Sequence, residues 1–473
     1  MTFSSPKKPP TTAPANPDGD RPEAEAARPP PGPLALPVWA RTAPRAPAPS
    51  FDFEFGLPGS KSLTLRDCAI AALADGQSTI RFPGECDDYW RMKDCLRRLG
   101  IEVDDRKSDE VAIGGRGGRF AEGPLELFTG QSAVSTRLLL AMAALRPGVT
   151  TLDGHSSMRA RPNKPLIDAL AELGAGMQST NDGYLPAQVT GNPSLRGPVR
   201  VPSDISSQYL TSLLIIAPLL PAGLDIVVEG KLTSKPYVDL TLDEMSKFGV
   251  AVDNRDYAEL RIAPQTYRAR TLNVEGDASG ASYFAALATL HGGRVRFENL
   301  GSETRQGDYA FFGLCEALGA RVTRHAQQTE IVGPATLGQG FSTDVDMTSM
   351  PDVAPTLMML APFLAQPTRI TGLSTLRVKE CDRIAAPTRE LRKLGVVVEE
   401  GPDFMRIEPL GEAARARTSA VEIETYHDHR IAMCFGVLGS MLPGLTILDP
   451  GCVGKTFPNY WKEWERCRAS GVR

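Results

Sequence analysis

Two patterns of apolar and polar positions repeat along the chain after residue 50. The first is a long apolar run, a small turn and a short alternating segment. It occurs six times, as RDCAIAALADGQSTI, RLLLAMAALRPGVTTL, QYLTSLLIIAPLLPAGLDIVV, ASYFAALATLHGGRVRF, PTLMMLAPFLAQPTRI and RIAMCFGVLGSMLPGLTIL. A helix that is apolar nearly all round is buried, and alternation of apolar and polar residues is typical of a strand. Each copy therefore predicts a buried helix that leads into a strand.

The second pattern is an amphipathic run that ends at a glycine and continues into alternating residues. It occurs as DCLRRLGIEVD, DALAELGAGMQ, DEMSKFGVAVD, GLCEALGARVT and RELRKLGVVVE, with glycines at 100, 174, 249, 319 and 395. Glycine takes the left-handed conformation that caps a helix at little steric cost. Together the two patterns predict α/β units of about 70–76 residues, which suit a solenoid, a closed ring or two globular halves of three units.

The first 50 residues differ in composition from the rest of the chain. Residues 1–49 hold 14 of the 39 prolines, including PPPGP and APRAPAP. Proline fixes φ and removes a backbone donor, so such a run favours extended, solvated chain. Acidic residues such as Asp18 and Glu23 argue against a chloroplast transit peptide. We predict that residues 1–50 form a disordered, linker-like extension.

Composition and charge exclude several classes of protein. The 473 residues are 42% hydrophobic, and the net charge of −4 offers no general attraction for nucleic acid. No apolar run reaches the length of a membrane span, and the amino terminus lacks the apolar core of a secretory signal. Eight scattered cysteines form no CxxC pair, which is typical of reduced thiols rather than a zinc site. We therefore expect a cytoplasmic protein without nucleic-acid or membrane partners.

Polar and charged residues gather where the buried helices are predicted to begin. The segments are GLPGSKS at 56–62, SDISSQY at 203–209, SKPY at 234–237 and HDHR at 427–430, and LRVKECDR at 376–383 precedes an amphipathic run. Glycines, hydroxyls and helix N-termini all suit anions. The cations offered are Lys61, Arg66, Arg161, Lys235, Lys379, Arg383, Arg430 and Lys455. This number of cations indicates a ligand with several negative charges, for which Asp352 and Glu380 would transfer protons.

Neither a nucleotide phosphate loop nor a metal centre is indicated. GLPGSKS lacks the spacing of GxxxxGK[ST]. The His-x-His pair formed by His427 and His429 has no second cluster of matching ligands in the sequence.

Seven segments together resemble the enolpyruvyl transferase family. They are PGSKS, SSQYLTSLL, SKPYVD, EGDASGASYF, RVKECDR, DHRIAMCF and ILDPGCVGKTFPNY, and the resemblance runs in order from about residue 51 to 465. It implies an α/β, two-domain enolpyruvyl transferase-like fold of six βαβαββ repeats, three in each domain. One domain would hold residues 57–273, and the other residues 51–56 plus 274–473. The implied protein is a monomer without cofactor or metal.

The resemblance also implies a reaction and its residues. Within the family, the segments are most similar to enzymes that transfer enolpyruvyl from phosphoenolpyruvate to the 5-hydroxyl of shikimate 3-phosphate. That transfer releases phosphate and belongs to the shikimate pathway of aromatic amino acid biosynthesis. The implied catalytic residues are Lys61, Asp352, Glu380 and His429. The implied substrate-binding residues are Ser62, Arg66, Arg161, Ser206, Ser207, Gln208, Ser234, Tyr237, Lys379, Arg383, Arg430 and Lys455, with Ala133 beside phosphoenolpyruvate.

Several positions depart from the family pattern. Gln131 and Ala133 stand where asparagine and glycine are common, and Leu65 and Thr375 each replace an asparagine. These changes leave open a related transferase that loads enolpyruvyl onto another hydroxyl, such as that of a nucleotide. A non-catalytic phosphosugar-binding protein is a further alternative, although it would need no proton donor such as Glu380.

Overall fold

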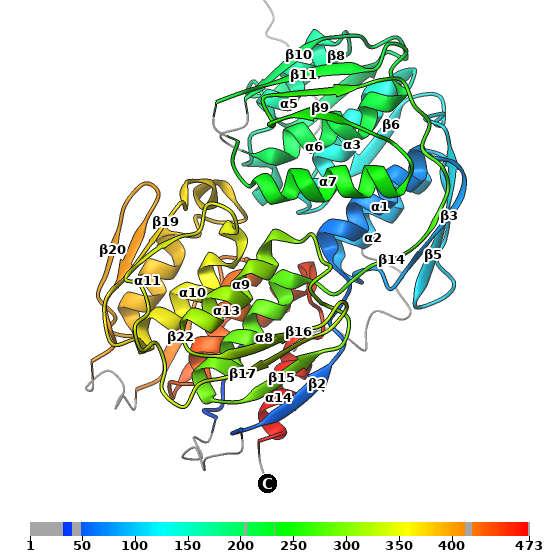
Figure 1. Ribbon diagram of the computed structural model, residues 1–473. Helices are drawn as coiled ribbons and strands as arrows, with labels where there is room; N and C mark the ends of the chain where they lie inside the picture. The colour runs from blue at the N-terminus through cyan, green and yellow to red at the C-terminus, as the bar shows by residue number, and fades with distance from the viewer. Residues whose placement is uncertain (1–31, 40–48, 203–205, 231, 412–418, 472–473) are drawn as a thin grey trace, which may run out of the picture.

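Two lobes make up the computed structural model, which describes residues 32–39, 49–202, 206–230, 232–411 and 419–471 (Figure 1). Each lobe has its own hydrophobic core. The core of the first lobe draws on residues between 63 and 274. The core of the second lobe draws on residues 36–57 and 278–467. The chain therefore starts in the second lobe, builds the first, and then returns.

The first lobe contains three four-stranded sheets. One combines β14 (Thr271–Asn273), β3 (Asp75–Arg81), β5 (Glu110–Arg116) and β4 (Glu102–Asp104) with α1 (Lys61–Leu73) and α2 (Asp87–Arg98). The next combines β6 (Leu125–Phe128), β7 (Gly148–Asp153), β9 (Tyr184–Gly191) and β8 (Gly176–Thr180) with α3 (Ala133–Leu145), α4 (Ser156–Arg159) and α5 (Lys164–Glu172). The third combines β10 (Val199–Pro202), β11 (Leu224–Glu229), β13 (Glu259–Ile262) and β12 (Asp253–Arg255) with α6 (Ser207–Ile216) and α7 (Lys235–Lys247).

The second lobe repeats the same plan. One sheet combines β2 (Asp52–Phe55), β15 (Arg294–Phe297), β17 (Thr329–Val332) and β16 (Arg321–Arg324) with α8 (Ala278–His291) and α9 (Phe311–Ala317). Another combines β18 (Asp344–Asp346), β19 (Thr368–Thr371), β21 (Met405–Ile407) and β20 (Val398–Glu400) with α10 (Ala354–Leu360) and α11 (Ala385–Lys393). The last combines β22 (Val421–Ile423), β23 (Leu445–Ile447) and β1 (Leu34–Ala35) with α13 (His429–Gly439) and α14 (Tyr460–Ala469).

All six sheets share one order of pairing. An edge strand runs parallel to a central strand, which pairs on its other side with an antiparallel strand. Six sheets thus accompany the six copies of the apolar pattern, and the predicted α/β class is confirmed. The pattern's glycines at 100, 174, 249, 319 and 395 all have positive φ, as their role as helix caps requires.

The sixth sheet corrects the prediction for the first 50 residues. After β23 the chain forms α14, so the antiparallel strand of this sheet comes from β1 instead, with Leu34 opposite Ile447. Leu36 and Trp39 are buried in the second core, and Trp39 stacks on His291 with ring centroids 4.9 Å apart. Residues 34–39 are therefore part of the fold, because the burial of Leu36 and Trp39 and the pairing with β23 stabilise this segment despite the neighbouring prolines. Residues 1–31 and 40–48 lie outside the described residues.

The buried helices of each lobe lie at its centre and direct their N-termini toward the other lobe. In the first lobe α1, α3 and α6 contact one another, and in the second α8, α10 and α13 do so, with the sheets around them (Figure 1). α1 and α8 are buried over nearly their whole length, as their uniformly apolar sequences predict. The polar residues at the starts of these helices therefore meet between the lobes.

Two chain crossings join the lobes side by side. Ser60 donates its backbone N–H to the Glu275 carbonyl at 2.8 Å, and Asp277 donates to the Pro58 carbonyl at 3.0 Å. Gly59 pairs with Gly276 across this junction. A side chain at Gly59 would lie 2.1 Å from the Phe82 carbonyl oxygen, so the crossing accepts only glycine there. None of the described helices is long and apolar enough to cross a membrane.

Candidate active site

A cavity between the two lobes gathers the site residues that the sequence predicted, with Lys235 as the exception. Its first-lobe wall includes Lys61, Ser62, Arg66, Ala133, Arg161, Ser206, Ser207, Gln208, Ser234 and Tyr237. Its second-lobe wall includes Asp352, Lys379, Glu380, Arg383, His429, Arg430 and Lys455. Seven Lys or Arg side chains and four carboxylates line the cavity. That excess of positive charge suits ligands with several negative charges.

Helix starts shape the cavity walls. α1, α3, α6, α8 and α13 all begin at the cavity, and each N-terminus adds a positive dipole end. Ser206 caps α6 by accepting a hydrogen bond from the backbone of Gln208. Ser234, at the start of α7, has the left-handed φ of 55°. Such backbone strain in a non-glycine residue is typical of functional sites.

Glu380 lies at the centre of a group of cations from both lobes. Its carboxylate is 2.8 Å from Arg161, 2.6 Å from Arg383 and 3.4 Å from Lys455. Burial alone would raise the pKa of Glu380, but these three cations outweigh it and hold the pKa well below the usual range. Glu380 is therefore ionised, and it pairs with cations that could also bind an anionic ligand.

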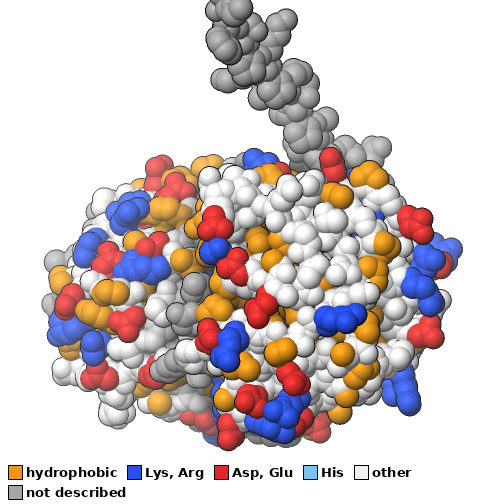
Figure 2. Space-filling model, turned by 90° about the horizontal axis from the view of Figure 1, so that it is seen from above, with side chains coloured by type: hydrophobic (Ala, Val, Ile, Leu, Met, Phe, Trp, Pro, Cys, Tyr) orange, Lys and Arg blue, Asp and Glu red, His pale blue; other side chains and the backbone are white. Residues whose placement is uncertain are grey.

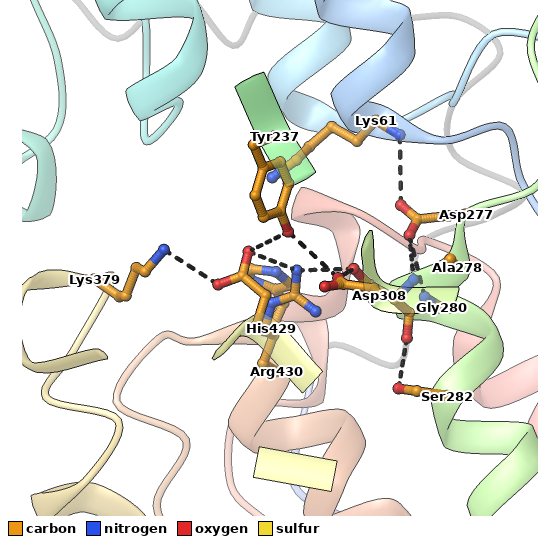
Figure 3. Close-up of polar contacts among 12 residues, drawn as sticks. Lys61, Tyr237, Asp277, Ala278, Gly280, Ser282, Asp308, Lys379, His429 and Arg430 are labelled. Carbon is orange, nitrogen blue, oxygen red and sulfur yellow. Dashed lines mark hydrogen bonds and ion pairs between the residues drawn. The ribbon is translucent and has the colours of Figure 1, made fainter. Parts of the chain in front are cut away.

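Asp352 is a second carboxylate of the cavity and shares Arg383 with Glu380. Its partners Lys379, Arg430 and Tyr237 are labelled in Figure 3. Lys379 lies 3.2 Å and Arg430 3.3 Å from its carboxylate. These cations, together with Arg383, overcome the effect of burial and hold the pKa of Asp352 well below its usual range. Tyr237, from the opposite lobe, donates its hydroxyl to Asp352 at 3.2 Å. This bond joins the two walls of the cavity.

Asp308 lies behind this cluster and was missed by the sequence analysis. It accepts hydrogen bonds from the hydroxyls of Ser279 and Tyr237. Burial, followed by the charge of Asp352, raises the pKa of Asp308 to about 6. Asp352 and Asp308 are thus neighbouring carboxyls whose pKa values move in opposite directions, an arrangement typical of acid–base sites.

Asp88 is a further carboxylate that the sequence analysis missed. It lies 3.3 Å from Lys61 and 3.2 Å from Lys455, which come from different lobes. Burial alone would lower the pKa of Lys61, but Asp88 and Glu380 outweigh it, so the pKa is raised. Asp88 is the second residue of α2, where an acidic side chain is expected from the helix dipole alone and does not indicate a ligand site.

The chain matches the family model described as EPSP synthase (3-phosphoshikimate 1-carboxyvinyltransferase) over residues 52–464. It is 40% identical to a 3-phosphoshikimate 1-carboxyvinyltransferase from Mannheimia haemolytica, a match that covers 87% of this chain and 96% of that protein. It is also 40% identical to an enzyme of the same name from a Nostoc species, over 87% of this chain and 95% of that protein. The chain belongs to the EPSP synthase family.

Solved structures share the fold of this EPSP synthase family member. An EPSP synthase from Acinetobacter baumannii superposes with a TM-score of 0.73 at 24% identity, covering 92% of this chain and 97% of that one. The enolpyruvyl transferase NikO from Streptomyces tendae superposes with a TM-score of 0.69 at 15% identity, covering 92% and 98%. The predicted family resemblance and the predicted enolpyruvyl transferase-like fold are therefore both confirmed.

His429 is buried and lines the cavity of this family member. Burial, followed by the positive charges of Arg383, Arg430 and Lys61, holds the pKa of His429 well below its usual range, although Glu380 opposes the shift. Neither ring nitrogen has a hydrogen-bond partner among the described residues. A neutral imidazole with both nitrogens unused is suited to hydrogen-bond a ligand, not to supply a charge.

One cation predicted for the site lies elsewhere. Lys235 does not line the cavity; its ammonium group lies 3.9 Å from the centre of the Tyr257 ring. Lys235 is the first residue of α7, and its side chain leaves the helix away from the site. By contrast Asp428, the N-cap of α13, holds Arg383 through two hydrogen bonds of 2.7 and 3.0 Å and orients it toward Glu380.

The described residues contain no group of three or more His, Cys, Asp or Glu side chains that could hold a metal ion. Three carboxylates of the cavity, Asp88, Asp352 and Glu380, instead pair with lysines and arginines. On the outer face shown in Figure 2, side chains of both charge signs are interspersed.

Proposed function

We propose that this chain transfers the enolpyruvyl group of phosphoenolpyruvate to the 5-hydroxyl of shikimate 3-phosphate and releases phosphate, as a step of aromatic amino acid biosynthesis. The observation that carries the proposal is the interlobe cavity of an EPSP synthase family member, in which seven cations face Asp352 and Glu380. Both substrates carry a carboxylate and a phosphate. Such ligands match a cavity with excess positive charge, and the carboxyl groups supply proton transfer.

The acceptor would bind mainly to the first lobe. Ser206, Ser207, Ser234 and Tyr237 would surround the 3-phosphate, and Ser62 and Arg66 would meet the ring and its carboxylate. Arg66 is buried, and among the described residues it donates hydrogen bonds to the Thr241 hydroxyl and to two backbone carbonyls. None of these neutralises its charge, so a carboxylate is a fitting partner.

Phosphoenolpyruvate would bind among the cations that surround Glu380. Arg161, Arg383 and Lys455 would hold its phosphate and carboxylate, with help from Lys61 and Arg430. Arg161, Arg383 and Lys455 contact Glu380 in the structure. An anion that shares them weakens their hold on the Glu380 carboxylate, so its pKa rises. Binding would thereby prepare Glu380 to carry a proton.

The reaction would proceed by addition and elimination. Glu380 gives a proton to the methylene carbon of phosphoenolpyruvate, and the acceptor oxygen forms a bond to the adjacent carbon. Asp352 takes the proton of that hydroxyl, with Lys379 orienting it. The carbon–oxygen bond to phosphate then breaks, and Glu380 takes back a proton from the new methyl group, so that the enol ether remains. The proton held by Asp352 passes to the released phosphate. The fixed cations stabilise the charge that develops at each step.

The two lobes would act as domains that close on the substrates, divided as residues 57–273 and residues 51–56 plus 274–473. Contacts between the walls support this, since Arg161 reaches Glu380 and the Lys379 carbonyl, and Lys455 reaches Asp88. Closure would exclude water, which would otherwise compete with the acceptor hydroxyl.

Phosphate release with purified protein tests the proposal. Phosphoenolpyruvate and shikimate 3-phosphate together should release phosphate, and either substrate alone should not. Glu380→Gln under the same conditions separates a catalyst from a binding protein. Phosphate release with a nucleotide acceptor, but none with shikimate 3-phosphate, would replace this acceptor with another.

A further inference from the structure

Arg137 is a buried arginine that the proposed mechanism does not use. It lies in the second turn of α3, in an otherwise apolar run, and its exposed fraction is 6%. Its guanidinium lies 4.7 Å from the centre of the Tyr209 ring. Its hydrogen-bond partners among the described residues are Asn163, Ser206, Gln208 and the Pro162 carbonyl. All four are uncharged, whereas buried charges are ordinarily paired.

Two of these partners line the cavity. Arg137 donates to the side-chain oxygen of Gln208 at 2.6 Å and to the hydroxyl oxygen of Ser206 at 3.3 Å. Arg137 has no acceptor atoms of its own. Both partners must therefore turn their acceptors toward Arg137.

The consequence for Gln208 follows from the geometry of an amide. When the side-chain oxygen faces Arg137, the NH2 group on the same carbon points away from it. Gln208 lines the cavity, and none of the described residues accepts a hydrogen bond from this NH2 group in the structure. Gln208 therefore offers two donors to a ligand.

The consequence for Ser206 follows from counting lone pairs. A hydroxyl oxygen has two acceptor sites. One accepts from the Gln208 backbone at 3.3 Å, and the other accepts from Arg137. With both sites used, Ser206 can add only its O–H as a donor to a ligand.

We infer that Arg137 is a positioning residue that makes Ser206 and Gln208 donors only, and so selects an acceptor substrate that carries a phosphate at this wall. Arg137 also places an unneutralised positive charge directly behind the two donors. Together these features favour an anion, which accepts hydrogen bonds, over a hydroxyl, which must also donate one. The inference rests on the proposed function, since that proposal places the 3-phosphate near Ser206.

Paired ligands and paired variants test this role. Shikimate 3-phosphate and shikimate differ only in the phosphate, and titration calorimetry measures the affinity of each. Arg137→Met keeps an unbranched side chain and removes the donors and the charge. Arg146→Met is the matched control, because Arg146 is fully buried at the end of the same helix and bonds only to backbone carbonyls and Thr150.

We expect Arg137→Met to weaken the binding of shikimate 3-phosphate by roughly 10- to 100-fold, the usual effect of one hydrogen bond to a charged group. The binding of shikimate should weaken by less than about 3-fold, because shikimate has no phosphate for the two donors to bind. Arg146→Met should leave both affinities unchanged. Equal weakening of both ligands by Arg137→Met, or unchanged binding of both, would overturn the role.

Gln208→Glu provides the result if Arg137→Met does not fold. A carboxylate keeps the bond to Arg137 but turns an oxygen, not an NH2 group, toward the cavity. The binding of shikimate 3-phosphate should then weaken more than the binding of shikimate. Unchanged affinity for shikimate 3-phosphate would overturn the inference. These outcomes are distinct from failure of the proposed function, in which the wild-type protein binds shikimate 3-phosphate but releases no phosphate when phosphoenolpyruvate is added.

Discussion

The two walls of the cavity carry similar numbers of cations but differ in what surrounds those cations. On the first-lobe side, Arg66 in the wall and Arg137 behind it are bonded to hydroxyls, amides and backbone carbonyls. The other first-lobe cations, Lys61 and Arg161, contact Asp88 and Glu380. On the second-lobe wall, Arg383, Arg430 and Lys379 are bonded to carboxylates. Unpaired cations leave room for an anionic ligand, whereas paired cations tune the carboxylates beside them. We infer that the first wall binds the acceptor and the second moves protons.

The carboxyl groups of the second wall are tuned in opposite directions. Neighbouring cations hold the pKa values of Glu380 and Asp352 well below the usual range, and burial raises that of Asp308 to about 6. A binding surface needs no such spread. The difference between the walls therefore predicts that substitutions on the second wall change turnover or pH dependence, and substitutions on the first change affinity.

The largest effect is expected at Glu380. Glu380→Gln keeps the shape of the side chain but removes its exchangeable proton, so turnover should fall by about 10²–10⁴-fold, the usual contribution of a general acid. Affinity for shikimate 3-phosphate should change little, since that ligand is assigned to the opposite wall. Steady-state kinetics and calorimetry measure the two quantities. Turnover close to that of wild type would remove Glu380 from the mechanism.

The second effect concerns pH and Asp308. Its raised pKa means that the folded protein holds a proton that the unfolded chain loses between about pH 4 and 6. The free energy of unfolding should therefore fall as pH rises through this window, by up to about 3 kcal/mol for a shift of about two units. Asp308→Asn should remove this dependence.

Urea unfolding of wild type and Asp308→Asn at several pH values between 4 and 7 measures the difference. Asp344→Asn is a suitable control because that aspartate is exposed, and its pH dependence should match that of wild type. A parallel pH dependence in Asp308→Asn and wild type would show that Asp308 does not titrate in this range.

On the first wall, Arg66→Ala should weaken the binding of the acceptor by about 10- to 100-fold and should change turnover at saturation much less. Arg66→Lys keeps the charge but loses the planar fork, so its affinity should lie between those of Arg66→Ala and wild type. The KM for shikimate 3-phosphate measures both. A fall in turnover at saturation with unchanged KM would contradict the division of roles between the walls.

The sequence predicted the site residues because the repeat places polar residues at the starts of buried helices. A helix that is apolar throughout needs only one capping residue, so clusters such as Ser206, Ser207 and Gln208 stood out. All the predicted site residues except Lys235 line one cavity. What the sequence could not supply was pairing across the lobes, such as Arg161 with Glu380, because partners separated by 219 residues in the chain carry no local signal.

Residues behind the cavity were missed for a related reason. Asp308 lies in a loop-like segment, GDYA, and Asp88 at an ordinary helix start, so neither differs in sequence from a solvated side chain. Arg137 did carry a signal, because it is the one charge in the apolar run RLLLAMAAL. The place of residues 34–39 in the fold was not predicted, because the composition of residues 1–50 is dominated by prolines. The few apolar residues of this segment, including those that pair with β23, change that composition little.

The smallest effect is expected at Ala133, on the first wall next to the proposed phosphoenolpyruvate position. Ala133 is the first residue of α3, and its methyl group lines the cavity with 8% of the residue exposed. The methyl should leave room for phosphoenolpyruvate but crowd a longer mimic such as glyphosate. Ala133→Gly should therefore lower the glyphosate inhibition constant by about 2- to 10-fold, on the order of one buried methyl group. Ala141→Gly, the same change in the buried middle of α3, should leave inhibition unchanged, and equal inhibition of wild type and Ala133→Gly would show that the methyl does not limit the inhibitor.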